Sequence, residues 1–205
     1  MARYYAGIGS RKTPLHILTL MQMIGFKLAT ERWVLRSGGA KGADAAFYKG
    51  LREFYAKRDS DTIAYPLAEI YVPWEGFGGH YRARELDFTH VFTDYEHDAA
   101  LNIASEIHPN WKACDSVAKL LHGRNVFQIL GHAMEEPVEM LICWSPVTGD
   151  SIKGGTRTAW EIAKRFKVRR LINLAVPEDF TRALQFVGLT EERLMALAGE
   201  VKLAA

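Results

Sequence analysis

The chain has 205 residues, of which 48% are hydrophobic and 24% charged, and its formal net charge is +2. This length supports one sizeable core, so we expect a single domain over residues 1–205. The near-neutral charge does not indicate a general nucleic-acid or membrane binder, and the N-terminus has no apolar stretch typical of a signal peptide or membrane helix. Two cysteines, Cys114 and Cys143, form no disulfide framework, so we expect free thiols and a cytoplasmic protein.

The first half of the sequence alternates between strand and helix patterns. Residues 3–8, RYYAGI, are aromatic and β-prone and predict a first strand. Thr13 followed by Pro14 resembles an N-cap with proline at the first helical position, and apolar residues at helical intervals then predict a helix over 15–31. The next predicted elements are a strand over 33–35, a helix over 43–55 and a strand over 69–73.

The second half begins with a segment that has no regular period. Residues 74–86, WEGFGGHYRAREL, are rich in glycine, aromatics and arginine and predict a functional loop. Helices are expected over 96–107 and 110–122, because His108-Pro109 interrupts any continuous helix. The apolar run VEMLICW at 138–144 is typical of a buried parallel strand. The last predicted elements are a helix over 156–166, a strand over 170–175 and a helical tail over about 178–197.

Strands that alternate with helices indicate an α/β protein with an open, mostly parallel sheet flanked by helices. Residues 74–135 then form a helical insertion between the third strand and the later strands, and we expect this insertion to contribute to the pocket. In such sheets, ligands bind at the carboxyl ends of the strands. Three glycine-bearing loops fall at these ends, over residues 7–11, 37–42 and 154–158.

Glycine at a strand-to-helix turn has two interpretations. It lets the backbone approach a phosphate at a helix N-terminus, where an anion is favoured, or it simply turns the chain. Three such loops at equivalent places favour the interpretation as a phosphate-binding site over that of simple turns. Neither GxxxxGKS/T nor GxGxxG after a strand is present, which removes support for an ATPase or an NAD-dependent oxidoreductase. The expected ligand contacts are Gly9, Ser10, Arg11, Ser37, Gly38, Gly39, Gly42, Asp44, Gly154, Gly155, Thr156 and Thr158.

Residues 74–86 supply candidates for contacts beyond the phosphate. Trp74 is suited to stack on a base, and Glu75 to bind a ribose hydroxyl or to act as an acid or base. Arg82 is suited to pair with a phosphate. The alternative for the segment with Trp74 and Glu75 is a hydrophobic loop folded on the core, and the alternative for Arg82 is a solvent-exposed helix residue.

A second concentration of polar residues lies in the segment HGRNVFQILGH. Arg124, Asn125 and Gln128 are candidates for lining the pocket, and His122 and His132 for proton transfer, although each histidine is equally open to a structural role. The seven histidines show no HExxH or comparable spacing, so we expect neither a metal site nor a cofactor.

Glu161 is the best single catalytic candidate. Near the start of a predicted helix, its carboxylate is placed to stabilise oxocarbenium-like charge at a ribose or to activate water. The alternative is an exposed charge that the helix dipole favours, and Asp44 has a similar choice between ligand contact and stabilising its own helix.

Three of these segments resemble proteins of the SLOG superfamily. GIGSR at 7–11 and RSGGAKGAD at 36–44 resemble the turns before the first two helices of DNA-processing protein A. The segment GGTRTAWE at 154–161 is similar to the GGxGTxxE motif of the lonely-guy phosphoribohydrolases, with Arg157 in place of the third glycine. The resemblance spans residues 3–75 and 137–177 and implies a Rossmann-like fold that binds a nucleotide or a nucleotide-derived ligand.

We therefore predict a protein that binds a nucleotide-type small molecule through these loops. Two alternatives stay open: an N-glycosidase acting on a nucleoside monophosphate, with Glu161 and Glu75 as catalytic residues, and a single-stranded DNA-binding protein like DNA-processing protein A. DNA binding requires a basic groove. The cations available near the loops are Lys12, Lys41, Lys153 and Arg157. We also expect a homo-oligomer that makes no membrane contact.

Overall fold

The computed structural model describes residues 2–57, 66–81, 88–91 and 94–203. Its centre is a six-stranded sheet in the order β4-β3-β2-β1-β5-β8, in which every pair of neighbouring strands is parallel. These strands are β1 (Arg3–Gly7), β2 (Trp33–Ser37), β3 (Ala68–Val72), β4 (Phe88–Val91), β5 (Met140–Cys143) and β8 (Arg170–Asn173). The predicted α/β, Rossmann-like fold is confirmed.

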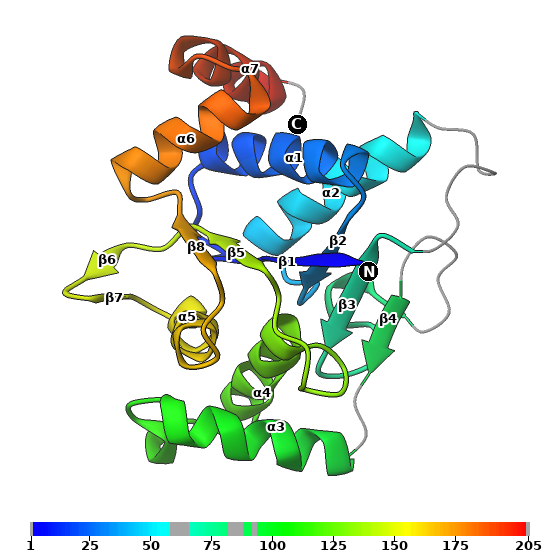
Figure 1. Ribbon diagram of the computed structural model, residues 1–205, viewed down its shortest axis with the longest axis vertical. Helices are drawn as coiled ribbons and strands as arrows, with labels where there is room; N and C mark the ends of the chain where they lie inside the picture. The colour runs from blue at the N-terminus through cyan, green and yellow to red at the C-terminus, as the bar shows by residue number, and fades with distance from the viewer. Residues whose placement is uncertain (1, 58–65, 82–87, 92–93, 204–205) are drawn as a thin grey trace.

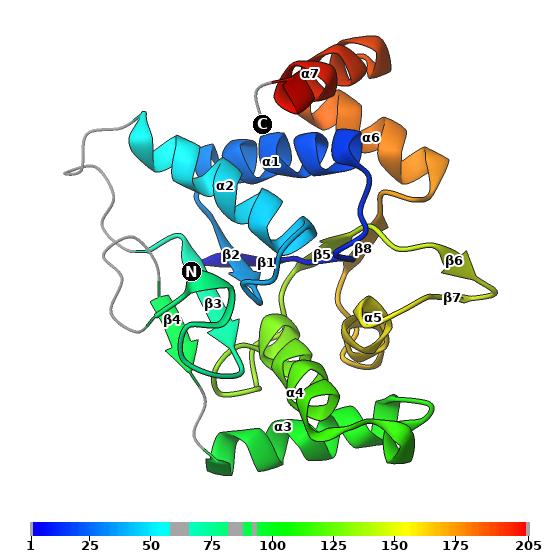
Figure 2. The same cartoon turned by 180° about the vertical axis from the view of Figure 1, so that it is seen from behind.

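Helices cover the two faces of the sheet in separate layers (Figures 1 and 2). One layer contains α1 (Leu15–Thr30), α2 (Ala43–Ala56), α6 (Pro177–Val187) and α7 (Glu191–Leu203). The other contains α3 (Asp94–Ile107), α4 (Ser116–Leu130) and α5 (Thr156–Arg165). The short elements are the 3-10 turns η2 (Phe77–Gly79) and η3 (Trp111–Ala113) and a hairpin of β6 (Val147–Thr148) and β7 (Ser151–Ile152). Within the described residues, no helix combines the length and apolarity needed to cross a bilayer.

Each face of the sheet has its own hydrophobic core, because successive side chains of a strand point to opposite faces. On β1, Tyr5 packs with Leu35 and Phe47 in the core beneath α1 and α2. Its neighbour Ala6 packs with Leu141 in the core beneath α4 and α5. This double burial explains why the strands read as continuous apolar runs.

The helices α1 and α2 cross with almost no space between their backbones. A Cβ atom at Gly50 would collide with the Gln22 carbonyl oxygen, and one at Gly25 would collide with that of Phe47. The crossing therefore depends on a glycine from each helix. It holds α2 against β1 and β2, and so it positions the loop that precedes α2.

Two helical predictions were wrong in their bounds. The predicted helix over 110–122 is α4, which begins at Ser116 because the Asp115 side chain caps it by accepting a hydrogen bond from the Ala118 amide at 2.7 Å. It ends at Gly131, whose positive φ of 74° stops the helix. The predicted tail is two helices, separated at Gly188 in the left-handed conformation.

The segment after β3 also differs from the predicted loop. Its first part forms η2, and Phe88–Val91 adds β4 to the sheet, paired with β3. The candidate Arg82 lies outside the described residues.

A buried arginine, Arg36, links β2 to neighbouring segments. The Arg36 guanidinium donates hydrogen bonds to the Glu69 carboxylate and the Glu136 carbonyl, both at 2.6 Å, and lies 3.7 Å from the Tyr4 ring centre. Burial lowers the pKa of Arg36, but the charges and hydrogen bonds of Glu69, Tyr71 and Glu136 together outweigh burial and leave the pKa raised. These contacts tie the segment between α4 and β5 to the sheet.

We expect Gly50→Ala to destabilise the protein by about 3 kcal/mol or more, because α1 and α2 must separate to admit the methyl group. Gly199→Ala is the matched control: the residue lies in α7, no atom of the described residues is within 4 Å of the added Cβ, and the change should stabilise the protein by about 0.5–1 kcal/mol. Guanidinium unfolding of both variants measures this, and equal small effects would show that the crossing tolerates a side chain.

Candidate functional site

The first two glycine loops meet at the carboxyl edge of the sheet. The strand β1 lies between β2 and β5, so the strand order reverses there and the loops on either side diverge. The Ser10 amide donates to the Trp144 carbonyl after β5 at 3.4 Å. A Cβ atom at Gly42, whose φ is +87°, would lie 3.0 Å from the Ser10 carbonyl oxygen. Backbone of the first two loops is thus in direct contact, as their placement after adjacent strands predicts.

One helix, α4, connects the second loop to the third. The Arg124 guanidinium donates to the Gly38 carbonyl at 3.0 Å, and the Asn125 side-chain amide donates to the Gly155 carbonyl at 3.1 Å. The side chains from α4 therefore lie between loops that are more than a hundred residues apart in the sequence. Arg124, Asn125 and Gln128 are all buried.

Asp44 holds the second loop from inside. Its carboxylate accepts hydrogen bonds from the amides of Gly38 at 3.2 Å and Ala40 at 3.3 Å, and also from the Gly9 amide of the first loop. Burial raises the pKa of Asp44, whereas the Arg124 charge and these amides act to lower it. Gly9 and Gly38 were predicted to contact a phosphate, and their amides are instead bound to the protein's own carboxylate.

Ser37 and Gly38 also have structural partners. The Ser37 hydroxyl is buried and donates to the Gly7 carbonyl at 2.7 Å, which ties β2 to β1. A Cβ atom at Gly38 would lie 2.5 Å from both the Arg124 guanidinium carbon and the Gln128 amide nitrogen. A side chain at 38 would therefore displace the polar ends of two side chains from α4.

The most unusual feature of this edge is a pair of buried polar groups without partners. Among the described residues, no hydrogen-bond partner exists for Arg124 Nε or for either polar atom of the Gln128 amide. Gln128 is 0% exposed and Arg124 is 9% exposed. Burial lowers the pKa of the Arg124 guanidinium, with the Asp44 carboxylate opposing it. Such groups are costly to leave unsatisfied in a folded protein.

An aromatic turn lies beside these groups. Gly78 approaches the Gly39 carbonyl so closely that no Cβ atom fits between them. Trp74 is 40% exposed and meets Phe77 edge to face with ring centres 5.1 Å apart, while the Arg124 guanidinium lies 5.5 Å from the Phe77 ring centre. Phe77 therefore lies between the partly exposed indole of Trp74 and the Arg124 guanidinium. Glu75 in the same turn is exposed.

The third loop leaves its backbone open. Gly154 has a φ of +74°, and no atom of the described residues lies within 4 Å of a Cβ built at Gly154 or Gly155. The helix α5 begins at Thr156 without a side-chain cap, and the Arg157 amide donates to the Gly154 carbonyl at 3.0 Å. The positive end of the helix dipole at this start favours an anion. Thr156 and Thr158 are buried. The exposed cations of the three loops are Arg11, Lys12, Lys41, Lys153 and Arg157.

Glu161 is engaged elsewhere. One carboxylate oxygen accepts a hydrogen bond from the Ser151 hydroxyl of β7, and the other lies 3.2 Å from the Lys164 ammonium. These contacts orient Glu161 toward the β6–β7 hairpin.

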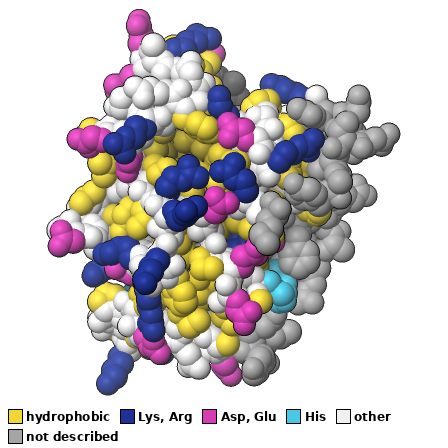
Figure 3. Space-filling model, in the orientation of Figure 1, with side chains coloured by type: hydrophobic (Ala, Val, Ile, Leu, Met, Phe, Trp, Pro, Cys, Tyr) yellow, Lys and Arg dark blue, Asp and Glu magenta, His cyan; other side chains and the backbone are white. Residues whose placement is uncertain are grey.

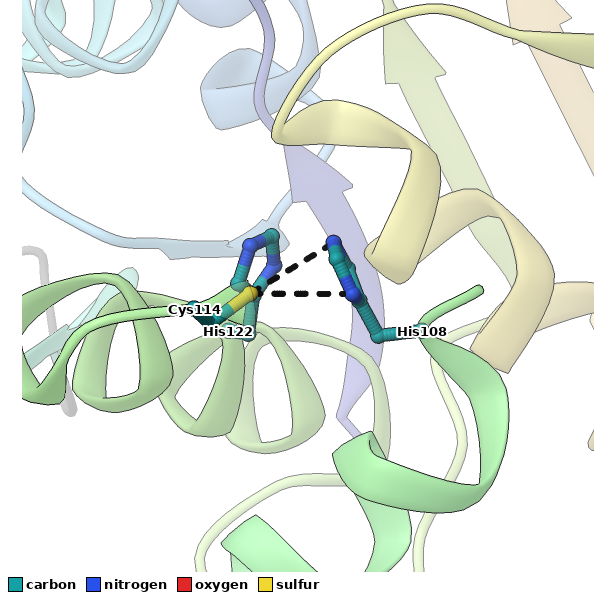
Figure 4. Close-up of side chains that lie close together, drawn as sticks. All are labelled: His108, Cys114 and His122. Atoms are coloured by element: carbon teal, nitrogen blue, oxygen red, sulfur yellow. Dashed lines mark hydrogen bonds between the residues drawn. The ribbon is translucent and has the colours of Figure 1, made fainter. Parts of the chain in front are cut away.

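Two histidines and a cysteine, residue types that commonly bind metal ions, lie together beside the third loop (Figure 4). His108 follows α3, Cys114 follows η3 and His122 lies on α4, and their ligand atoms are all within 4.8 Å of one another. The His122 Nδ1 lies 2.8 Å from the Thr158 hydroxyl of α5. Sequence spacing did not indicate this cluster, because the three residues do not follow a short regular motif.

A second concave feature lies at the opposite, amino end of the sheet. Figure 3 shows Lys and Arg side chains among hydrophobic ones on one face of the molecule. A cavity of about 520 Å³ there has an apolar floor between α1 and α6. Two of its arginines have acidic partners, Arg3 with Glu139 and Arg182 with Asp179. Its other arginines are Arg169 and Arg170.

No protein-family model and no curated protein sequence matches the chain. Solved structures of the molybdenum cofactor carrier protein of Chlamydomonas reinhardtii resemble it in fold. One has 15% identity and a TM-score of 0.46 and covers 99% of each chain. Two others have 16% identity, with TM-scores of 0.44 (100% of this chain, 99% of the other) and 0.43 (90% and 84%). At these values the likeness concerns the fold alone and says nothing about a ligand.

We expect His122 to make stability depend on pH. Burial, together with the charges of His108 and Arg124, lowers the pKa of His122 from 6.5 to about 4. Between these values the unfolded chain binds a proton that the folded protein does not, so this stability is complete above pH 6.5 and is lost as pH falls toward 4. The contribution is roughly 1–2 kcal/mol, allowing for the exposed part of the ring.

Urea unfolding of the wild type and His122→Gln across this pH range, in the presence of a chelator, measures the effect. The variant should show a flatter dependence on pH. A constant difference between the two proteins would contradict the assignment.

Proposed function

We propose that the protein binds a phosphate-bearing, nucleotide-type small molecule at the carboxyl edge of its sheet, between the second and third glycine loops. The supporting observation is a pair of buried groups on α4, Arg124 Nε and the Gln128 amide, which press against Gly38 and have no hydrogen-bond partner in the described part of the chain. An unsatisfied buried polar group costs roughly 1–3 kcal/mol. A ligand that accepts from Arg124 and bonds to Gln128 would recover this free energy.

The charges around the site favour an anion. Exposed cations surround the loops, and the start of α5 adds uncapped backbone amides beside two glycines with open space. Because Asp44 already binds the amides of Gly38 and Ala40, we assign the phosphate to the start of α5 and to Arg124 instead.

The aromatic turn favours a planar ring next to the phosphate. Trp74 is partly exposed and stands against Phe77, which itself faces Arg124. A base stacked on the indole would keep its phosphate within reach of Arg124. This arrangement supports a nucleotide over a simple inorganic anion.

We propose binding rather than turnover. Glycosidic cleavage by the predicted route needs a free carboxylate near the ribose. Both oxygens of Glu161 are held, one by Ser151 and the other by Lys164.

Isothermal titration calorimetry with AMP, GMP, CMP and UMP tests the proposal. Inorganic phosphate and a phosphorylated pterin, which lacks a ribose, serve as comparison ligands. We expect at least one mononucleotide to bind more tightly than phosphate. Absence of binding by every mononucleotide would overturn the proposal.

Gln128→Met separates a ligand contact from a structural role. Methionine fills a similar volume without a polar group, so the free energy of unfolding should stay unchanged or rise by up to about 1 kcal/mol. Mononucleotide affinity should fall about 10-fold or more. Gln185→Met, at an exposed position on α6, is the control and should change neither quantity. A destabilised Gln128→Met with unchanged affinity would show that the amide serves the fold.

Binding to an oligo-dT strand distinguishes the DNA alternative. A single-stranded DNA binder would show a steep fall in affinity with salt and would prefer the strand to a mononucleotide. A filter-binding salt titration measures both.

A further inference from the structure

The side chains of His108, Cys114 and His122 converge from three separate segments, the end of α3, the turn after η3 and α4 (Figure 4). His108 Nδ1 lies 3.7 Å from Cys114 Sγ, and the two imidazole ring centres are 4.3 Å apart. In a tetrahedral zinc site, the usual bond lengths place nitrogen and sulfur ligands about 3.6 Å apart. The cluster therefore has nearly the dimensions of a metal site before any metal binds.

We propose that His108, Cys114 and His122 bind a divalent zinc-like metal ion with an open fourth position. Two imidazoles and one thiolate suit an ion of intermediate softness, and they neutralise one of its two positive charges. Three protein ligands leave one position for water or for a donor atom of another molecule.

The hydrogen bond to Thr158 orients one of the ligands. When His122 binds a metal through Nε2, its Nδ1 carries the proton and donates to the Thr158 hydroxyl, 2.8 Å away. A hydrogen bond from the other ring nitrogen to a neighbouring group is the usual second contact of a metal-bound histidine. Thr158 is 2% exposed, so this contact is held rigidly by α5.

The other two ligands exchange weak contacts for metal bonds. His108 Nδ1 accepts from the Asn110 amide at 3.3 Å, and the Cys114 thiol donates to the Asn110 carbonyl at 3.6 Å. Binding releases both of these contacts and the thiol proton. The positive charge of Arg157 lies near His108 and acts against a bound cation there.

The metal would lie next to the proposed ligand site without forming part of it. Thr158 belongs to the first turn of α5, which starts at the Gly154–Gly155 turn, and His122 precedes Arg124 by two residues on α4. Metal binding does not depend on a nucleotide, so either proposal can fail alone.

Cobalt(II) titration of the full-length, chelator-treated protein tests the site. We expect one equivalent to bind with a sulfur-to-cobalt charge-transfer band and the visible bands of tetrahedral cobalt, and Zn²⁺ to displace it. Cys114→Ser should abolish the charge-transfer band and weaken Zn²⁺ binding about 100-fold or more. Cys143→Ala, which removes the buried thiol of β5, should leave the band in place. Thr158→Val should weaken Zn²⁺ binding about 10-fold without loss of the band.

Alkylation of the wild-type protein gives a test that needs no variant. Zn²⁺ should protect Cys114 from iodoacetamide, as mapped by mass spectrometry. Cobalt binding without a thiolate band, a band that persists in Cys114→Ser, or alkylation of Cys114 at the same rate with and without Zn²⁺ would each overturn the proposal.

Discussion

The buried carboxylate of Asp44 is the contact on which the carboxyl edge of this protein depends. It takes hydrogen bonds from amides of the first and second loops and faces the positive charge of Arg124. A charge buried without such partners would be strongly unfavourable, so the loops, α2 and α4 must take up one arrangement relative to each other. Because the carboxylate takes up amides that were expected to bind an external anion, the buried polar atoms without a partner among the described residues belong to Arg124 and Gln128 on α4.

The same dependence links the two helical layers. The close crossing of α1 and α2 sets the position of Asp44 on one side of the sheet, and Arg124 reaches the Gly38 loop from α4 on the other. Consequently, a change in the packing of either layer is transmitted to the polar groups between them. The proposed metal ligands share this support, since His122 lies on α4 and Thr158 on α5.

Local patterns were enough to predict five of the six strands of the sheet and most of the helices. Apolar runs such as VEMLICW are buried on both sides, so their strand character is visible without knowledge of the partner. The glycine loops were found for a similar reason, because a turn between strand and helix restricts its own residues. The start of α4 was predicted wrongly because it depends on the Asp115 cap rather than on the apolar period. The strand β4 was missed because its sequence, FTHV, contains no continuous apolar run. The hydrogen bond that Glu161 accepts was not predicted, because its partner Ser151 lies on a hairpin that no local pattern indicated.

The sequence by itself therefore determined the α/β class, the order of the main elements and the three loops at one edge of the sheet, since each follows from the period and turn chemistry of neighbouring residues. Only the tertiary structure decided which polar groups remain without partners and which side chains converge. Ser37 donates a hydrogen bond to the Gly7 carbonyl, and Asp44 accepts one from the Gly38 amide. In contrast, Gln128 is buried with no partner among the described residues. His108, Cys114 and His122 come together through the packing of α3, η3 and α4. Whether a polar group finds a hydrogen-bond partner, and which side chains meet, depends on distances between segments far apart in the chain. Only the folded arrangement of the layers sets those distances.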